Sequence, residues 1–156
     1  MKQVIGILLM VVVLSTSCNK NQLPQQATEI QQVLAAKEFT FKAQTANPVG
    51  SRSISLTGGY DLIIKPGSID AALPFFGRAY APVDLNAGGI NFNSKRFQYA
   101  ATADGKGGWQ ILIRPEDVPE VQELNLNISA DGYGTLHVTN TNRQAISFYG
   151  EITKNK

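Results

Sequence analysis

The chain has 156 residues, of which 43% are hydrophobic and 17% charged, and its 14 basic side chains nearly balance 12 acidic ones. This length corresponds to one domain that can bury a core without staples, and the single cysteine excludes a disulfide within the chain. Because the charge is nearly balanced and no basic patch occurs, we expect no nucleic-acid partner.

The N-terminus is typical of a secretory signal that ends at a cysteine. Lys2 gives a positive start, and residues 4–14 form an unbroken apolar run that is shorter than the ~20 residues of a membrane-spanning helix. Small residues at 15–17 then precede Cys18. The sequence therefore predicts a lipoprotein signal peptide over residues 1–17 and acylation of Cys18. The alternative is an ordinary cleaved signal followed by an incidental cysteine.

A tether and one helix are expected next. Residues 18–27 are polar and interrupted by Pro24, which predicts a flexible connection to a single domain over residues 28–156. Acyl chains on Cys18 would hold this domain at a membrane. The domain starts with a short predicted helix, in which Thr28 is the candidate N-cap and apolar residues from Ile30 recur at helical spacing.

Alternating apolar and polar residues predict strands over most of the remaining chain. The predicted strands are 38–44, 53–56, 60–65, 96–103, 109–114, 123–130, 134–139 and 145–152. Asp131-Gly132 is typical of a tight hairpin, and residues 104–108 and 140–143 form longer polar turns. No helical stretch separates the later strands. We therefore predict a mainly β fold, either an antiparallel β-sandwich or a flattened open barrel.

Motifs for catalysis or metal binding are weak. Zinc needs several converging ligands, whereas the one histidine, His137, is predicted on the polar face of its strand. Residues 105–108 lack the flanking residues of a phosphate loop and are interpreted as a hairpin. The acidic residues within 116–123 are interpreted as a solvated turn. We therefore expect no enzyme activity, no metal and no cofactor.

The stretch LPFFGRAYAP at residues 73–82 has two interpretations. It opens a segment, residues 74–96, with little periodicity, and a connection this long is uncommon inside a compact domain. In the first interpretation its aromatic residues form a lid that closes the core. In the second they line a ligand groove in which an arginine is the polar group. The candidate residues are Phe75, Phe76, Arg78, Tyr80 and Trp109.

Several spaced motifs carry a resemblance to a known family. They are SLTGGYDL (55–62), LPFFGRAY (73–80), GGINF (88–92), NR (142–143) and ISFYG (146–150). Together they resemble the domain-of-unknown-function family numbered forty-two fifty-one, found among Bacteroidetes-type envelope lipoproteins, over roughly residues 39–152. The resemblance implies an exported, mostly β domain behind a lipoprotein signal. It implies no reaction, cofactor or catalytic residue.

These observations lead to one expected function and one alternative. We expect a lipid-anchored cell-envelope protein with a non-catalytic binding or structural role, whose partners are the membrane and an apolar ligand or an envelope protein. The acidic residues that follow the cysteine in many surface-displayed lipoproteins are missing here. We therefore expect the outer membrane, on the side that faces the periplasm. The alternative is a periplasmic carrier of a lipid or other apolar ligand, which would need an interior cavity.

Overall fold

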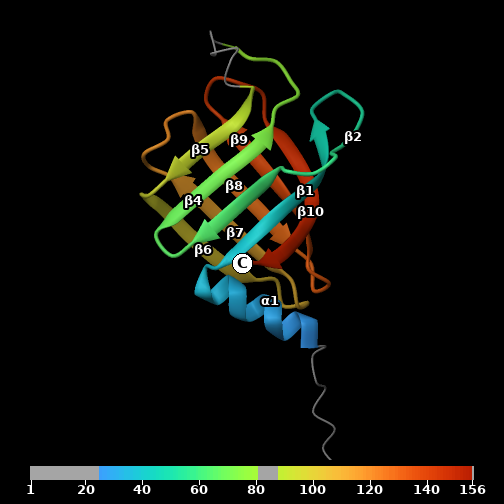
Figure 1. The fold of residues 1–156 in the computed structure, drawn as a ribbon, viewed down its shortest axis with the longest axis vertical. Helices are drawn as coiled ribbons and strands as arrows, with labels where there is room; N and C mark the ends of the chain where they lie inside the picture. Colours follow the sequence, from blue (N-terminus) through green and yellow to red (C-terminus); the bar gives the residue numbers. More distant parts are fainter. Residues whose placement is uncertain (1–24, 81–87, 156) are drawn as a thin grey trace, which may run out of the picture.

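The computed structural model describes residues 25–80 and 88–155, and within them one helix precedes a series of strands (Figure 1). The helix is α1 (Gln25–Ala36). The strands are β1 (Phe39–Pro48), β2 (Ile54–Ser55), β3 (Asp61–Lys65), β4 (Ser68–Pro74), β5 (Gly89–Ser94), β6 (Phe97–Ala103), β7 (Trp109–Pro115), β8 (Val121–Ile128), β9 (Tyr133–Asn140) and β10 (Ile146–Lys154). The predicted signal peptide and Cys18 lie outside the described residues.

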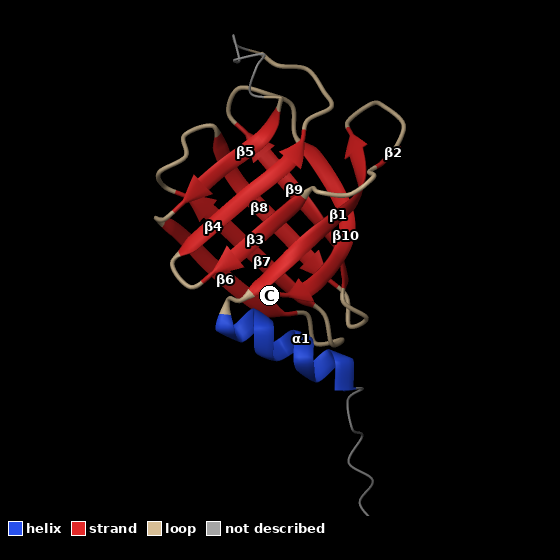
Figure 2. Ribbon diagram, viewed as in Figure 1, coloured by secondary structure: helices blue, strands red, loops and turns tan. Residues whose placement is uncertain are grey.

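The strands form one antiparallel sheet that is nearly closed into a barrel. The strand order is β5-β4-β3-β1-β10-β9-β8-β7-β6, and the short β2 pairs with β1 beside this path. β5, β4, β3 and β1 form one layer that crosses the layer of β9, β8 and β7 behind it (Figure 2). The predicted mainly β, antiparallel fold is therefore confirmed, in its flattened-barrel form.

Alternate residues of most strands fill the interior. In β8, Leu124, Leu126 and Ile128 are buried while Asn127 is exposed, which is the alternation seen in the sequence. His137 lies on the exposed face of β9, as predicted. The Asp131-Gly132 turn joins β8 and β9, and Gly132 has the positive φ of +85° that this hairpin favours. The core is thus built from residues whose spacing is local and regular.

Helix α1 packs across one end of the barrel and ends in a Schellman motif. Lys37 has a φ of +55°, and the N–H groups of Lys37 and Glu38 donate to the carbonyl oxygens of Leu34 and Val33 at 3.2 and 2.9 Å. The Tyr99 hydroxyl donates to the same Leu34 oxygen at 3.3 Å. Burial raises the pKa of Tyr99 to about 12, so this hydroxyl keeps its proton and its bond to the helix.

Two expectations about the start of the domain differ from the structure. α1 begins at Gln25, three residues before the expected start of the domain, and Thr28 lies inside the helix rather than at its N-cap. Glutamine and alanine are good helix formers, so residues 25–27 form the start of the helix although they lack an apolar period. Within the described residues, no helix is long and apolar enough to cross a membrane.

The expectation that residues 74–96 form an irregular connection is wrong for the end of that segment, which forms a strand. The strand that leads into the segment was not predicted either. β5 (Gly89–Ser94) lies within the segment, and β4 (Ser68–Pro74) leads into it. In β4 the outward-facing Ala72 is apolar, which obscures the alternation of buried and exposed positions. β5 does alternate, but it is only six residues long and begins with the second of two consecutive glycines. Both strands gain their stability from pairing with each other across six residue pairs.

Candidate functional site

The barrel has a seam between β5 and β6, the two strands at the ends of the sheet order. The chain turns directly from one strand to the other at Lys95-Arg96, and the connection between β7 and β8 is fastened to this corner. The carboxylate of Asp117 accepts hydrogen bonds from the Ser94 hydroxyl and from the backbone N–H groups of Lys95 and Arg96, the latter two at 2.9 and 3.1 Å. The corner therefore holds residues 116–120 against the open side of the barrel.

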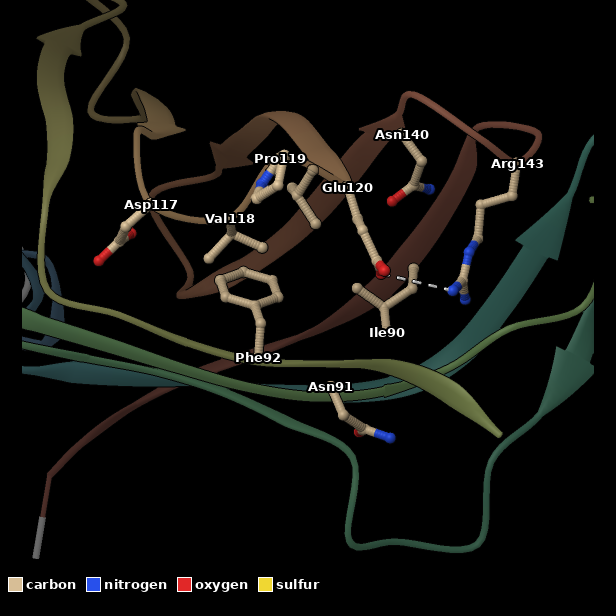
Figure 3. Close-up of a pocket in the computed structure, with 10 residues that line it drawn as sticks. Ile90, Asn91, Phe92, Asp117, Val118, Pro119, Glu120, Asn140 and Arg143 are labelled. Atoms are coloured by element: carbon tan, nitrogen blue, oxygen red, sulfur yellow. Dashed lines mark ion pairs between the residues drawn. The ribbon is translucent and has the colours of Figure 1, made fainter. Parts of the chain in front are cut away.

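The hydrogen bonds at this corner stabilise the ionised form of Asp117. The Ser94 hydroxyl, followed by the Lys95 N–H, lowers the pKa of Asp117 from 3.8 to about 2. The Asp117 side chain therefore remains an anion to a lower pH than an ordinary aspartate, and its oxygens accept hydrogen bonds from the corner. In Figure 3 it lies at one end of the adjoining pocket and points away from it.

A pocket of about 280 Å³ lies along the seam (Figure 3). Its residues come from β5, from the 116–120 connection, from the start of β8, and from the end of β9 and the turn that follows. They are Ile90, Asn91, Phe92, Asp117, Val118, Pro119, Glu120, Val121, Asn140 and Arg143. Ile90 and Phe92 rise from β5 toward Val118 and form an apolar wall. Glu120, Asn140 and Arg143 lie together at the end opposite Asp117 and make that end polar.

Arg143 is the central polar group of the pocket. Its side chain is only 8% exposed, which is rare for an arginine. Nη1 donates to the carbonyl oxygen of Gly89 at 2.7 Å, and the guanidinium lies over the ring of Phe75, 5.1 Å from its centroid. Nη2 faces the Glu120 carboxylate at 3.7 Å, an ion pair too long for a hydrogen bond. A buried cation is thus held mainly by a carbonyl oxygen and an aromatic face.

The turn that carries Arg143 is fixed by the stretch singled out in the sequence. Residue 79 forms an isolated antiparallel bridge with Arg143. On either side of it, the Gln144 N–H donates to the Arg78 oxygen at 2.9 Å and the Tyr80 N–H donates to the Asn142 oxygen at 2.8 Å. The LPFFGRAYAP stretch therefore supports Arg143 through its backbone and through the ring of Phe75.

The sequence-predicted site residues are placed at different locations. Phe75 and Phe76 are half-buried and pack against the core, whereas Arg78 is exposed and Tyr80 is 70% exposed. Trp109, at the start of β7, pairs with Ile128 at the end of β8 and lines a separate hollow near Tyr149. The structure therefore does not bring these five side chains into one groove.

Asn140, Arg143 and Glu120 are the site residues that sequence reasoning missed. Residues 140–143 were interpreted as a polar turn and Glu120 as part of a solvated acidic stretch. The available signal was the Asn142-Arg143 motif of the family resemblance, which marked this turn without assigning it a role. Asn140 adds a second polar group, because its Nδ2 is buried without a hydrogen-bond partner among the described residues. In the described part of the chain, no three acidic, histidine or cysteine residues converge as metal ligands do.

The fold and the seam define a small, mainly β domain built on one nearly closed antiparallel sheet. Residues 21–152 match the family model described as "Domain of unknown function (DUF4251)", so the chain belongs to this family. The comparison with curated proteins gives no match. A solved structure, the 1.95 Å crystal structure of a DUF4251 family protein from Bacteroides eggerthii DSM 20697, has a TM-score of 0.63 and 12% identity over 83% of this chain and 88% of that chain. The two proteins share the fold, and the family predicted from the motifs is confirmed.

Proposed function

We propose that this protein is a lipid-anchored component of the cell envelope that binds a small ligand in the seam pocket and catalyses no reaction. The buried Arg143 guanidinium is the observation that carries the proposal, because it opens onto a hollow with an apolar wall. Small-molecule sites combine an apolar lining with a few convergent polar groups in this way. The described lining residues include no paired nucleophile and base, which favours binding over catalysis.

Binding in the pocket is tested with a library of soluble acids, amines and neutral molecules, screened against the full mature chain by ligand-observed NMR. We expect hits that protect the protein against thermal unfolding and that are lost in Arg143→Gln. Arg78→Gln is the matched control, because it removes a nearby but exposed arginine. A library without hits, or hits that bind Arg143→Gln unchanged, would contradict the proposal.

The anchor rests on the sequence. The short apolar run of residues 4–14 ends at Cys18, the only cysteine of the chain, and the acyl chains would replace a spanning helix as the attachment. We place the protein at the outer membrane, facing the periplasm, because no acidic residues follow Cys18 directly.

Cells fed a radiolabelled fatty acid test this part of the proposal. We expect label in the wild-type protein and none in Cys18→Ser, because the lipid is attached at the cysteine sulfur. When the same cells are fractionated, the wild-type protein should be found in the membrane fraction and Cys18→Ser in the soluble fraction. Equal labelling of the two proteins would exclude the anchor and would leave the pocket proposal standing.

A carrier that holds a lipid inside the barrel is the second candidate. Such a carrier needs inward-facing side chains that border an open space. Phe41, Leu126 and Phe148 point inward and are each 0% exposed, so the interior is filled at these positions. The packing therefore favours the seam pocket over the barrel interior as the ligand site.

A further inference from the structure

The described residues neutralise the charge of Arg143 incompletely. The one ion pair that it makes among them, with Glu120, spans 3.7 Å, and the Glu120 side chain is 65% exposed, so water screens most of the attraction. Nη1 makes the one hydrogen bond that the guanidinium forms with a described residue. A cation withdrawn from water is costly unless an anion with good geometry pairs with it. The pocket therefore presents a buried positive group that a better-placed anion would stabilise.

A second donor lies at the same end of the pocket. Asn140 Nδ2 is buried and has no partner among the described residues, although buried amide groups are normally hydrogen-bonded. Asn140 and Arg143 lie on the same side of Glu120 in Figure 3 and line one hollow. Two donors, one of them a guanidinium, fit an acceptor with two oxygens that share a negative charge.

The other charged residues that line the pocket are negative and favour a ligand with a single negative charge. Asp117 borders the pocket at its far end, where its carboxylate points away and accepts hydrogen bonds from the 94–96 corner. Glu120 contributes a second negative charge. A ligand with two anionic ends would place one of them toward Asp117, whereas the wall of Ile90, Phe92 and Val118 between the two ends accepts an apolar chain.

From these contacts we infer that the seam pocket binds a small monocarboxylate with a short apolar chain. In the free protein Glu120 pairs with Arg143, and the ligand carboxylate replaces Glu120 in this pair. This inference rests on the proposed function and names its ligand class. Glu120 acts as an internal competitor: it is tethered to the site, but it is too exposed and too distant to satisfy the guanidinium. The ligand brings a carboxylate that can approach Nη2 and Asn140 together, and its chain lies against β5.

Hexanoate is the probe, and 1-hexanol, hexylamine and the dicarboxylate adipate are its matched comparisons. Titration of the full mature protein, followed by amide chemical shifts, is expected to show hexanoate binding at least tenfold more tightly than the other three. Shortening the chain to butyrate should weaken binding about fourfold for each methylene that leaves the apolar wall. Equal binding of hexanoate and 1-hexanol would overturn the inference.

Two variants test the competition directly. Glu120→Gln keeps the shape of an exposed side chain and removes its charge, so the variant should fold and should bind hexanoate several-fold more tightly. Arg143→Gln should bind hexanoate and 1-hexanol equally, while Arg78→Gln should match the wild type. Unchanged or weaker hexanoate binding in Glu120→Gln would refute the competitor role.

The failure of this inference is distinguishable from the failure of the proposed function. If neutral or cationic compounds of the library contact the seam and hexanoate does not, the ligand class is wrong and the pocket remains the site. If no compound of any charge binds there, both fail. If an acetylated peptide binds through its free C-terminus and hexanoate does not bind, the ligand is a protein C-terminus and not a small acid.

Discussion

Replacing Gly150 by alanine is expected to destabilise the protein by about 3 kcal/mol or more, at the upper end of what overpacking costs. An added Cβ would overlap the carbonyl oxygen of Lys42 on the neighbouring strand and would lie 3.0 Å from Cζ of Phe41. Gly150 pairs with Ala43 beside the irregularity in the β1–β10 ladder, so a backbone shift there disturbs the pairing of two central strands.

Urea unfolding of Gly150→Ala and of the wild type measures this effect. Gly88→Ala is the control, because its Cβ meets no atom within 4 Å and its φ is not in the left-handed region. The control should unfold within about 0.5 kcal/mol of the wild type. A similarly small change in Gly150→Ala would mean that β1 and β10 do not approach each other as closely as described.

Truncating Phe41 to alanine is expected to cost about 3–5 kcal/mol, because the transfer free energy of the ring is lost and a cavity remains. Phe41 is 0% exposed and lies on β1, near the centre of the sheet order. Tyr80→Ala removes a ring of similar size that is 70% exposed, and it should change stability by about 0.5 kcal/mol or less. The denaturant midpoints of the two variants provide the comparison, at an equal dependence of the unfolding free energy on denaturant concentration. Equal losses would mean that Tyr80 is buried in solution.

The sequence predicted the parts of the fold that depend on local spacing. The alternation of Leu124, Leu126 and Ile128 assigned both the strand and its buried face, because successive side chains of a strand point to opposite sides. The same periodicity placed His137 outside the core. At Gly132 the turn type could be predicted because few residues tolerate its positive φ.

Elements defined by their neighbours were harder to predict. Ala72 faces outward in β4 although it is apolar, since a small side chain is tolerated on an exposed strand face. The choice between a sandwich and a barrel could not be made from the sequence either. That choice depends on which strands pair, and the pairing of β1 with β10 joins residues that are 98 to 115 positions apart.

The candidate site was the least predictable part, because it is assembled from distant segments. The sequence drew attention to Arg78, which is adjacent to aromatic residues along the chain. In the structure it is Arg143 that lies over Phe75, and its hydrogen bond to Gly89 spans 54 positions. Periodicity carries no information about such a contact. Only the family resemblance marked both segments, and it did not indicate that they meet.

The position of α1 determines how the domain would be oriented above a bilayer. α1 leads into Phe39, which pairs with Lys154 at one end of the barrel, whereas Arg143 precedes the start of β10 at the other end (Figure 1). Gln25 lies seven positions after Cys18, and even a fully extended chain of this length reaches only about 25 Å. A lipid on Cys18 would therefore keep the helical end near the headgroups, and the Arg143 end of the pocket would lie up to about 30 Å further out, the length of β10. Its ligand would then arrive from the aqueous compartment rather than by lateral diffusion within the leaflet.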